Sequence, residues 1–179
     1  MYVSRKITSE ILTYFNDIPV TAIIGARQVG KSTLAKKLLV DKKDIIYLDL
    51  EANADRQLLE EPIRFFEIHQ SKIICIDEIQ LIPELFAEIR AFVDKNESVK
   101  FLILGSSSPE LLRQSSESLA GRIFYYELSP FLFLEINNDY DLQTYWFRGG
   151  FPNSLLARSN PLSKTWLKNY IKTFLERDI

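Results

Sequence analysis

A complete phosphate-binding loop near the start of the chain limits the folds that this sequence can adopt. A short β-branched run, 20–24, precedes the loop, and the helix-forming segment 33–40 follows it. Strand, glycine loop and helix in this order form the context in which the pattern G-x-x-x-x-G-K-S/T binds phosphate. The sequence therefore predicts an α/β domain built around a nucleotide site. The loop consists of Gly25, Ala26, Arg27, Gln28, Val29, Gly30, Lys31, Ser32 and Thr33.

The residue types in this loop suit the chemistry of a polyphosphate. Its glycines allow the backbone to curl so that successive N–H groups face an anion. Lys31 is expected to place a positive charge on the β- and γ-phosphates, and Ser32 is expected to offer its hydroxyl to Mg²⁺. The helix that follows directs its positive end at the same anion. We therefore expect ATP and Mg²⁺ at this loop.

The first part of the chain alternates between strand-like and helix-like patterns. Nearly continuous apolar residues in the three middle strands are typical of strands buried on both faces of a parallel sheet. The alternation itself predicts a parallel sheet with helices on both faces. Strands are predicted over 20–24, 45–50, 72–76, 99–104 and 123–127, and helices over 7–15, 55–69, 83–94 and 109–118.

The pattern changes at Ser129, after which we predict helices and no strand. Two domains follow from this change: an α/β core over 1–128, with an N-terminal helix over 5–16, and a small helical lid over 129–179. The last helix begins near Pro161 and reaches Ile179 without a Gly or Pro stop signal. We therefore expect the lid to be truncated at its C-terminal end, a frayed natural terminus being the alternative.

A pair of acids follows the third predicted strand. Four apolar residues, 73–76, lead directly into Asp77 and Glu78. Because ligands of open α/β sheets bind at the carboxyl ends of the strands, Asp77 is expected to hold Mg²⁺ opposite Ser32. Glu78 is then placed to polarise an attacking water. A kinase that transfers phosphate to a bound acceptor needs no such glutamate, so Glu78 favours hydrolysis over small-molecule kinase chemistry.

Serines follow the fourth predicted strand, at the same edge of the sheet. Ser106 or Ser107 is expected to hydrogen-bond the γ-phosphate or the attacking water, and so to sense whether that phosphate is present. The structural alternative is a helix start, with Ser108 as the N-cap before Pro109. Both interpretations can hold together, because different serines would serve them.

Arg122 ends a helical pattern just before the fifth predicted strand. One interpretation is an arginine finger that acts on the γ-phosphate of a neighbouring subunit, which implies a homo-oligomer. The other is a salt bridge or helix cap, with Gly121 in the left-handed conformation. The sequence leaves both open.

The composition excludes several classes of protein. The 179 residues carry a formal net charge of −2, so no general positive field attracts nucleic acid. The single cysteine, Cys75, lies in an apolar strand and is expected to be a small core residue. A single cysteine rules out an internal disulfide and is typical of proteins in a reducing compartment. The single histidine, His69, lacks neighbours at metal-ligand spacing. No apolar run reaches the roughly 18 residues of a membrane span, and we predict a cytoplasmic protein.

An ordered series of motifs resembles a known family. The series comprises G-A-R-Q-V-G-K-S-T-L, Y-L-D-L-E, I-D-E-I-Q with L-I-P-E-L-F, L-I-L-G-S-S-S, S-L-A-G-R, E-L-S-P-F and R-G-G-F-P. It is similar to the AAA+-type ATPases of prokaryotes that carry a C-terminal domain of unknown function, within the wider group of AAA+ and signal-transduction ATPases. The resemblance extends over most of the chain, from Gly25 to Ile179.

The resemblance implies a sheet with strand order 5-1-4-3-2 and a helical lid. It also implies that Pro152, in Gly150-Phe151-Pro152, packs near the adenine; a turn followed by a helix-starting proline is the alternative. Members of this family are usually much longer, which again indicates truncation. Arg148 is a weak candidate for a second sensor in the lid.

We therefore predict a Mg²⁺-dependent ATPase domain that couples the nucleotide state to a conformational change or to the action of an unknown protein partner. One alternative is a nucleotide-dependent signalling switch or scaffold with little turnover. A P-loop kinase acting on a small molecule is another. DNA is a partner by family analogy only, because no basic or aromatic footprint supports it.

Overall fold

A five-stranded parallel sheet organises the chain, which we describe from a computed structural model covering residues 2–96 and 98–178. The order across the sheet is β2-β3-β4-β1-β5, so the predicted order 5-1-4-3-2 is confirmed. All strand pairs are parallel, and their carboxyl ends therefore share one edge of the sheet. The strands are β1 (Val20–Ile24), β2 (Ile45–Asp49), β3 (Ile73–Asp77), β4 (Lys100–Gly105) and β5 (Ile123–Glu127).

The chain forms two compact units, which are described separately. The sheet unit comprises Lys6–Ala26 and Lys31–Leu128, and the helical unit comprises Met1–Arg5, Arg27–Gly30 and Ser129–Ile179. The middle of the phosphate loop thus groups with the helical segments, although it lies between β1 and α2 in the sequence. The predicted division of the chain into domains 1–128 and 129–179 stays a prediction.

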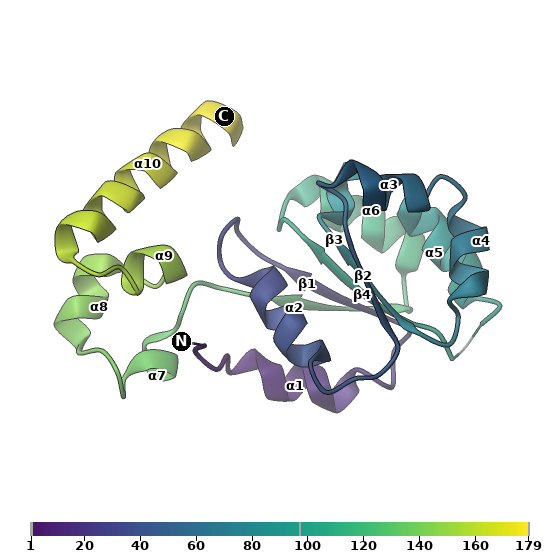
Figure 1. The fold of residues 1–179 in the computed structure, drawn as a ribbon, viewed down its shortest axis with the longest axis horizontal. Helices are drawn as coiled ribbons and strands as arrows, with labels where there is room; N and C mark the ends of the chain where they lie inside the picture. Colours follow the sequence, from purple (N-terminus) through teal and green to yellow (C-terminus); the bar gives the residue numbers. More distant parts are fainter. Residues whose placement is uncertain (1, 97, 179) are drawn as a thin grey trace. The chain divides into compact units, whose positions relative to one another are not determined.

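Helices cover both faces of the sheet, as predicted. α1 and α2 lie on one face, and α4, α5 and α6 lie on the other (Figure 1). In the order β2-β3-β4-β1-β5, the chain moves from β1 toward the β2 edge, and the later connections β2–β3, β3–β4 and β4–β5 all run toward the β5 edge. Right-handed crossovers that run in opposite directions place their helices on opposite faces of the sheet. The helices are α1 (Ile7–Tyr14), α2 (Lys31–Leu39), α3 (Asn53–Leu58), α4 (Pro62–Ile68), α5 (Leu85–Val93) and α6 (Pro109–Leu119), with a 3₁₀ helix η1 (Ile79–Leu81) before α5.

The single helix predicted over 55–69 is wrong, since two short helices, α3 and α4, occupy this region. Pro62 is the first residue of α4 and has no N–H to continue a preceding helix. Glu61, restricted by the proline that follows it, has φ −119° and ψ 76°, outside the helical region. The proline therefore ends one helix and starts the next.

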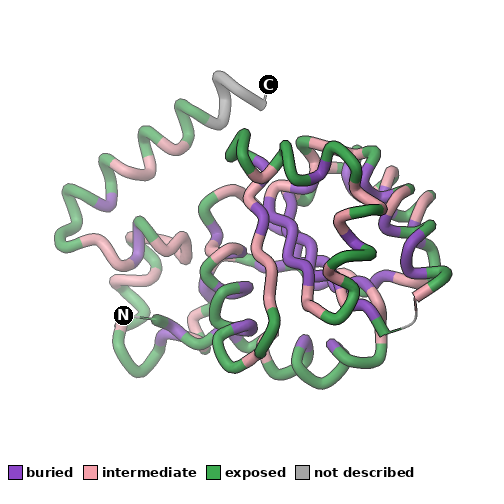
Figure 2. The backbone as a smooth tube through the Cα atoms, turned by 45° about the vertical axis from the view of Figure 1, so that its right-hand side comes forward, coloured by how far each residue is buried: buried purple, intermediate pink, exposed green. Residues whose placement is uncertain are grey.

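Apolar burial holds the sheet unit together (Figure 2). Every residue of β1 is buried, and β3 and β4 are buried over most of their length. Phe66 of α4 is fully buried, and its ring packs against those of Phe92 and Phe101 at centroid distances of 5.5 and 5.0 Å. β2 differs from the expectation of burial on both faces, because it is an edge strand whose residues are mostly half-buried.

Residues 129–178 contain no strand, as predicted, and form four helices: α7 (Phe133–Ile136), α8 (Leu142–Arg148), α9 (Pro152–Leu155) and α10 (Asn160–Asp178). A small core of Val3, Phe131, Ile136 and Leu155 joins them to the N-terminal segment. The expectation of a truncated last helix rests on Ile179, which lies outside the described residues.

A buried arginine connects the separate segments of the helical unit. Arg5 forms an ion pair with Glu135 at 3.2 Å, and both side chains are almost inaccessible. The same guanidinium donates to the carbonyl oxygens of Ser129 at 2.5 Å and Val29 at 3.3 Å. It also lies 4.7 Å from the centre of the Phe131 ring. One side chain thus ties the N-terminal segment and the phosphate loop to the chain that follows the sheet.

Candidate nucleotide site

The phosphate loop turns sharply between the end of β1 and the start of α2. Gly30 has φ +102°, a conformation that side-chain-bearing residues rarely adopt, and a Cβ there would meet nothing within 4 Å. Glycine is therefore required at this position by the backbone and not by a lack of space. Gln28 has φ 60° although it is not a glycine. Such strained backbone is found in loops whose N–H groups converge on an anion.

Lys31, the first residue of α2, is buried beneath the loop. Its ammonium group donates to the carbonyl oxygens of Gly25 at 3.0 Å and Ala26 at 3.1 Å. These bonds hold the first part of the loop around the lysine, so the side chain that is expected to meet the phosphates also shapes their binding loop. Ser32 and Thr33 lie in the first turn of α2, where backbone N–H groups have no partner within the helix.

The two acids lie where the sequence places them, at the carboxyl end of β3. Asp77 is 4% exposed, and its Oδ1 accepts the backbone N–H of Glu78 at 2.9 Å. Glu78 has φ 57°, so the chain turns abruptly just after the strand. A left-handed non-glycine residue costs about 1–3 kcal/mol and marks a conformation that its surroundings enforce.

Gln80 holds the carboxylate of Glu78, a contact that the sequence analysis missed. Its amide nitrogen donates to Glu78 Oε2, and its amide oxygen accepts the backbone N–H of Ser106 at 3.3 Å. Gln80 therefore joins the ends of β3 and β4. The available signal was the I-D-E-I-Q motif, in which a polar residue follows the acids at a spacing of two and interrupts an apolar run.

Tyr47 of β2 is a second residue that the sequence analysis missed. Its hydroxyl donates to Asp77 Oδ2 at 2.5 Å, and the Ser32 side chain lies near enough to the phenol to act on its pKa, in the lowering direction. Burial, together with the bond to Asp77, raises the pKa of Tyr47 far above its ordinary value, so the phenol stays neutral. No short-range pattern distinguishes this tyrosine from the other apolar residues of β2.

These contacts gather the side chains that suit a hard cation. Asp77 accepts the Tyr47 hydroxyl and Ser32 lies near the same phenol, so the two side chains share one end of the sheet. A hydroxyl and a carboxylate are ligands that Mg²⁺ accepts, the remaining positions being filled by phosphate oxygens and water. Within residues 2–96 and 98–178, no group of three or more His, Cys, Asp and Glu side chains forms a metal cluster. A cation held by the Ser32 hydroxyl and the Asp77 carboxylate would take its further ligands from phosphate or water.

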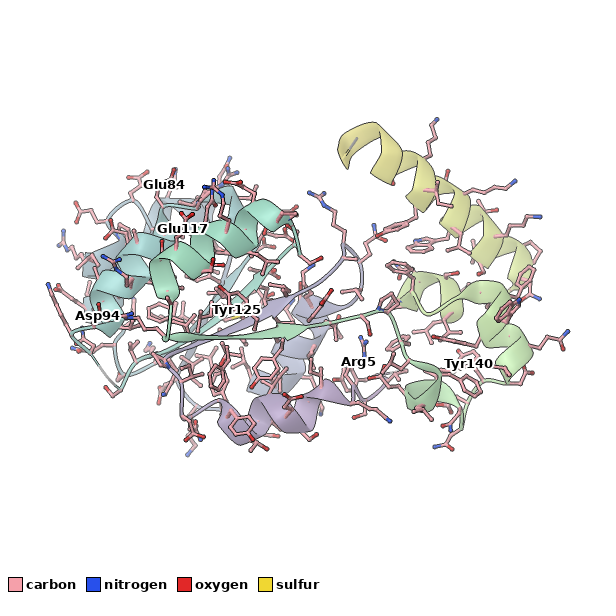
Figure 3. The ribbon with its side chains drawn as sticks, turned by 180° about the vertical axis from the view of Figure 1, so that it is seen from behind. Arg5, Glu84, Asp94, Glu117, Tyr125 and Tyr140 are labelled. Carbon is pink, nitrogen blue, oxygen red and sulfur yellow. The ribbon has the colours of Figure 1, made fainter. Side chains whose placement is uncertain are left out.

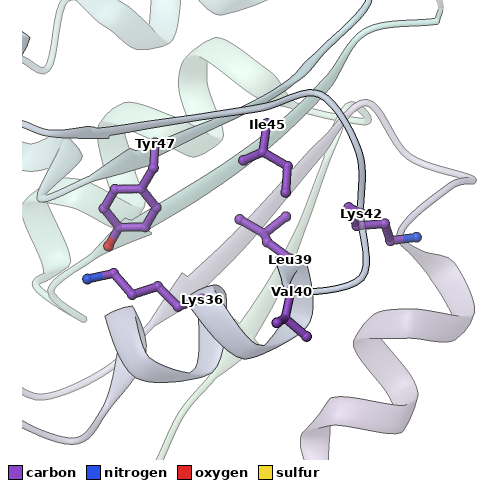
Figure 4. Close-up of a pocket in the computed structure, with 6 residues that line it drawn as sticks. All are labelled: Lys36, Leu39, Val40, Lys42, Ile45 and Tyr47. Atoms are coloured by element: carbon purple, nitrogen blue, oxygen red, sulfur yellow. The ribbon is translucent and has the colours of Figure 1, made fainter.

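A shallow groove of about 460 Å³ lies beside this cluster, between α2 and β2 (Figure 4). Lys36 and Tyr47 line one end of it, with the Lys36 ammonium 5.1 Å from the centre of the Tyr47 ring. Lys36 follows Ser32 by one turn of α2, so the two residues lie on the same side of that helix.

The serines after β4 have separate roles in the structure. Ser108 is the N-cap of α6, and its hydroxyl accepts the N–H of Leu111 at 3.3 Å, so the predicted helix start is confirmed. Ser106 is half-buried and bonds to Ser108 and Gln80, whereas Ser107 is exposed. Ser106 is thus linked to Glu78 through Gln80. A γ-phosphate sensor at Ser106 or Ser107 stays a prediction.

Arg122 lies at the amino end of β5, the sheet edge opposite to the acids. Its guanidinium forms a two-point ion pair with Asp94, and this pairing lowers the pKa of the Asp94 carboxyl. It also donates to the Ala120 carbonyl at 2.9 Å, and Gly121 has φ 76°. The salt-bridge interpretation is therefore observed. A finger acting on another subunit stays a prediction.

The predicted lid residues belong to the helical unit. Pro152 is the first residue of α9, the helix-start alternative, and its contact with adenine stays a prediction. Arg148 donates to the carbonyl oxygens of Leu155 at 3.0 Å and Ala157 at 2.6 Å, and to the side chain of Asn160 at 2.8 Å. These bonds fix the connection from α8 to α10, which is a structural use of the arginine.

The single cysteine lies in the core of the sheet unit, as expected. Cys75 is fully buried in β3, and burial raises the pKa of its thiol well above the ordinary value. His69 ends α4, with its ring 4.6 Å from that of Phe65. Among the described residues, no helix is sufficiently long and apolar to cross a membrane.

Comparison with known protein families gives two matches along the chain. The AAA domain family matches residues 17–137, which include the sheet from β1 to β5 and the phosphate loop. A domain of unknown function matches residues 139–179. The two matches adjoin near the point where the strands end and the helices of the C-terminal segment begin.

Two curated relatives are each 41% identical to this chain over 162 residues. They are the uncharacterized proteins Rv2008c of Mycobacterium tuberculosis and Mb2031c of Mycobacterium bovis. The match covers 90% of this chain but only 36% of each relative, so the chain spans about a third of their length.

Solved structures share the fold at low sequence identity. The Walker-type ATPase PABY2304 of Pyrococcus abyssi matches with a TM-score of 0.66 and 18% identity, over 98% of this chain and 75% of its own. A signal transduction ATPase with numerous domains from Pyrococcus horikoshii, PH0952, which has a tetratricopeptide repeat sensor, matches with a TM-score of 0.57 and 17% identity. That match covers 86% of this chain and 29% of the other.

Proposed function

This chain belongs to the AAA domain family of AAA+-type P-loop ATPases, and from that membership we propose that it binds ATP with Mg²⁺ and hydrolyses the bond between the β- and γ-phosphates. The observation that carries the proposal is the cluster at the carboxyl end of β3. There, Asp77 accepts the Tyr47 hydroxyl, Ser32 lies near the same phenol, and Glu78 follows Asp77 directly. Phosphate-loop folds place nucleotide phosphates at this edge of the sheet.

Each residue of the cluster has a role that its environment supports. Lys31, Ser32 and the loop N–H groups from Gly25 to Thr33 bind the phosphates. Ser32 and Asp77 hold Mg²⁺, which when bound neutralises part of the charge on the phosphates. Glu78 orients the attacking water and accepts its proton. Catalysis then depends chiefly on positioning and on electrostatic stabilisation.

The contact between Glu78 and Gln80 favours a second candidate, a nucleotide-dependent switch with little turnover. One oxygen of the Glu78 carboxylate already accepts a hydrogen bond from Gln80, so the amide competes with an attacking water for that oxygen. Gln80 also bonds to Ser106, the predicted sensor, so a change at the γ-phosphate can reach Glu78 through this glutamine. In this case the protein binds ATP tightly, and the bound state is the output.

Substitution of the loop lysine and of the glutamate tests the proposal. Lys31→Ala is expected to weaken ATP binding by about 100-fold, since it removes charge-assisted hydrogen bonds of about 1.5–3 kcal/mol each. Lys37→Ala, which changes an exposed lysine of the same helix, is the control. Nucleotide affinity is measured by calorimetry, and unchanged affinity in Lys31→Ala would refute the loop assignment.

Glu78→Gln separates binding from hydrolysis. We expect ATP affinity close to that of the wild type and a turnover lower by about 10²–10³-fold, the range of general-base catalysis. Glu84→Gln, at an exposed position before α5, is the control. Tight binding with almost no free phosphate from the wild type would favour the switch. Phosphate transferred to an acceptor would favour a small-molecule kinase.

A partner of the ATPase is part of this proposal. Since the chain spans about a third of its curated relatives, we propose that a protein partner or a further domain receives the nucleotide signal. A homo-oligomer in which Arg122 acts on a neighbouring subunit is an extension of this proposal. The proposal of DNA as a partner rests on family analogy alone. A cytoplasmic location is proposed from the single cysteine and the absence of a membrane-length apolar run in the sequence.

A further inference from the structure

Tyr47 reaches the candidate metal ligands from the edge strand of the sheet. In the parallel register Tyr47 lies opposite Cys75, two residues before Asp77. Because alternate residues of a strand share a face, Tyr47 and Asp77 project from the same face, the one that α2 covers. Diagonal neighbours of this kind are about 7–8 Å apart, a distance that an aromatic side chain can span. The backbone pairing thus brings the phenol hydroxyl to the carboxylate.

The hydrogen atoms in this cluster can be assigned from the chemistry of the groups. The phenol has one hydrogen, and Asp77 Oδ2, 2.5 Å away, accepts it because a carboxylate has none to give. The phenol then has no hydrogen left for Ser32, whose hydroxyl lies near it, so Ser32 can only donate to the phenol oxygen. Hydrogen donation in this cluster is therefore expected to run from the Ser32 hydroxyl to the Tyr47 hydroxyl, and it runs from there to the Asp77 carboxylate.

This direction of donation leaves the correct atoms available to a cation. Once the Ser32 hydrogen is directed at Tyr47, the lone pairs of its oxygen are free for a metal. Asp77 accepts one N–H at Oδ1 and the phenol at Oδ2, so both oxygens are held in place while each keeps further acceptor capacity. The ring is itself held by Lys36, whose ammonium lies 5.1 Å from the ring centre (Figure 4).

We infer that Tyr47 is a positioning residue that orients Ser32 and Asp77 for the divalent cation accompanying the nucleotide. The inference rests on the proposed nucleotide function and adds a residue from a strand that carries no part of the phosphate loop or of the acid pair. Tyr47 acts through its two neighbours and does not itself touch the metal. Its removal should therefore affect the part of nucleotide affinity that depends on Mg²⁺ and leave the remainder unchanged.

Tyr47→Phe tests this inference, because it removes one oxygen and keeps the ring and its contact with Lys36. The affinity for ADP and for a non-hydrolysable ATP analogue is measured by calorimetry, once with Mg²⁺ and once with EDTA. We expect the gain in affinity on adding Mg²⁺ to fall about tenfold in the variant, which corresponds to about 1.4 kcal/mol. The affinity in EDTA should change by less than about twofold, since no phosphate contact is lost.

Tyr125→Phe is the matched control (Figure 3). Tyr125 of β5 donates its hydroxyl hydrogen to Ser115 Oγ at 2.7 Å, so this variant also removes one tyrosine–side-chain hydrogen bond from the same unit. Both variants should lose thermal stability, but only Tyr47→Phe should lose Mg²⁺ dependence. An equal loss of affinity with and without Mg²⁺ in Tyr47→Phe would show a merely structural role and overturn the inference.

A second measurement keeps the test decisive if Tyr47→Phe is poorly stable. In the background of Asp77→Asn, Tyr47→Phe should have little further effect on the Mg²⁺-dependent gain, because the two residues act in one chain. Additive effects would contradict the inference. A wild-type protein that binds nucleotide with a Mg²⁺-dependent gain, shared by Tyr47→Phe, overturns the role of Tyr47 alone. A wild-type protein that binds no nucleotide overturns the proposed function.

Discussion

Replacing Arg5 with methionine is expected to destabilise the helical unit by about 3–5 kcal/mol, the usual cost of leaving one member of a buried ion pair without its partner. Arg5 and Glu135 have side chains that are 4% and 3% exposed. Methionine fills much of the same volume but donates no hydrogen bond. The variant therefore leaves a buried carboxylate and the carbonyl oxygens of Ser129 and Val29 without the guanidinium. Typical domains are stable by only about 5–15 kcal/mol, so the loss is large.

Tryptophan fluorescence during urea unfolding measures this effect in the correct unit. The chain has two tryptophans, Trp146 and Trp166, and both lie in the helical unit. Trp166 stacks on Tyr170 at a centroid distance of 5.0 Å, so its emission should change when the unit opens. Circular dichroism of the same samples reports both units together. We expect the fluorescence transition to shift to lower urea by more than the dichroism transition.

Two further variants show whether the ion pair is responsible. Arg64→Met removes an exposed pair with Glu61, and its effect should be close to zero because solvent screens such pairs. Arg5→Met combined with Glu135→Gln removes the buried charge and should be less destabilised than the sum of the single variants. A loss below about 1 kcal/mol in Arg5→Met, or strict additivity in the pair, would refute the reasoning.

Three other substitutions or treatments test the fold. Phe66→Ala should cost about 3–5 kcal/mol in urea unfolding, because it removes a fully buried ring from the core of the sheet unit. Gly150→Ala should disrupt the helical unit, since a Cβ there would collide with the Phe131 carbonyl oxygen; an unchanged tryptophan transition would contradict this. The Cys75 thiol, whose pKa is raised by burial, should resist alkylation at pH 8 and react fully only after denaturation. Rapid labelling of the folded protein would show that Cys75 is accessible.

The sheet could be predicted from the sequence because each strand carries its own signal. Short apolar runs separated by helical patterns specify parallel strands, and the structure has strands at all five predicted places. The strand order came from the family resemblance, because no local pattern states which strands are neighbours. The error over 55–69 arose from giving an apolar, helix-forming pattern more weight than Pro62.

The candidate site was predicted only where its residues are adjacent in the sequence. The loop from Gly25 to Thr33 and the pair Asp77–Glu78 are contiguous, so their spacing indicates their chemistry. Tyr47 was missed because its partner Asp77 belongs to another strand, and Gln80 was missed because its bond to Ser106 reaches the residue after β4, although its other partner, Glu78, is two positions away. Tyr47 bonds to a residue 30 positions away, and Gln80 bonds to one 26 positions away.

What the chain encodes locally is therefore the phosphate loop, whose function depends on the N–H groups of neighbouring residues and on glycine at Gly30. The contacts of the side chains around that loop, by contrast, are determined only by the tertiary structure. Strand register brings Tyr47 to Asp77, and the packing of the helical unit brings Arg5 to Val29 and to Glu135, which is 130 residues away. Side-chain bonds of this kind form only after distant segments have packed, because no short stretch of sequence contains both partners.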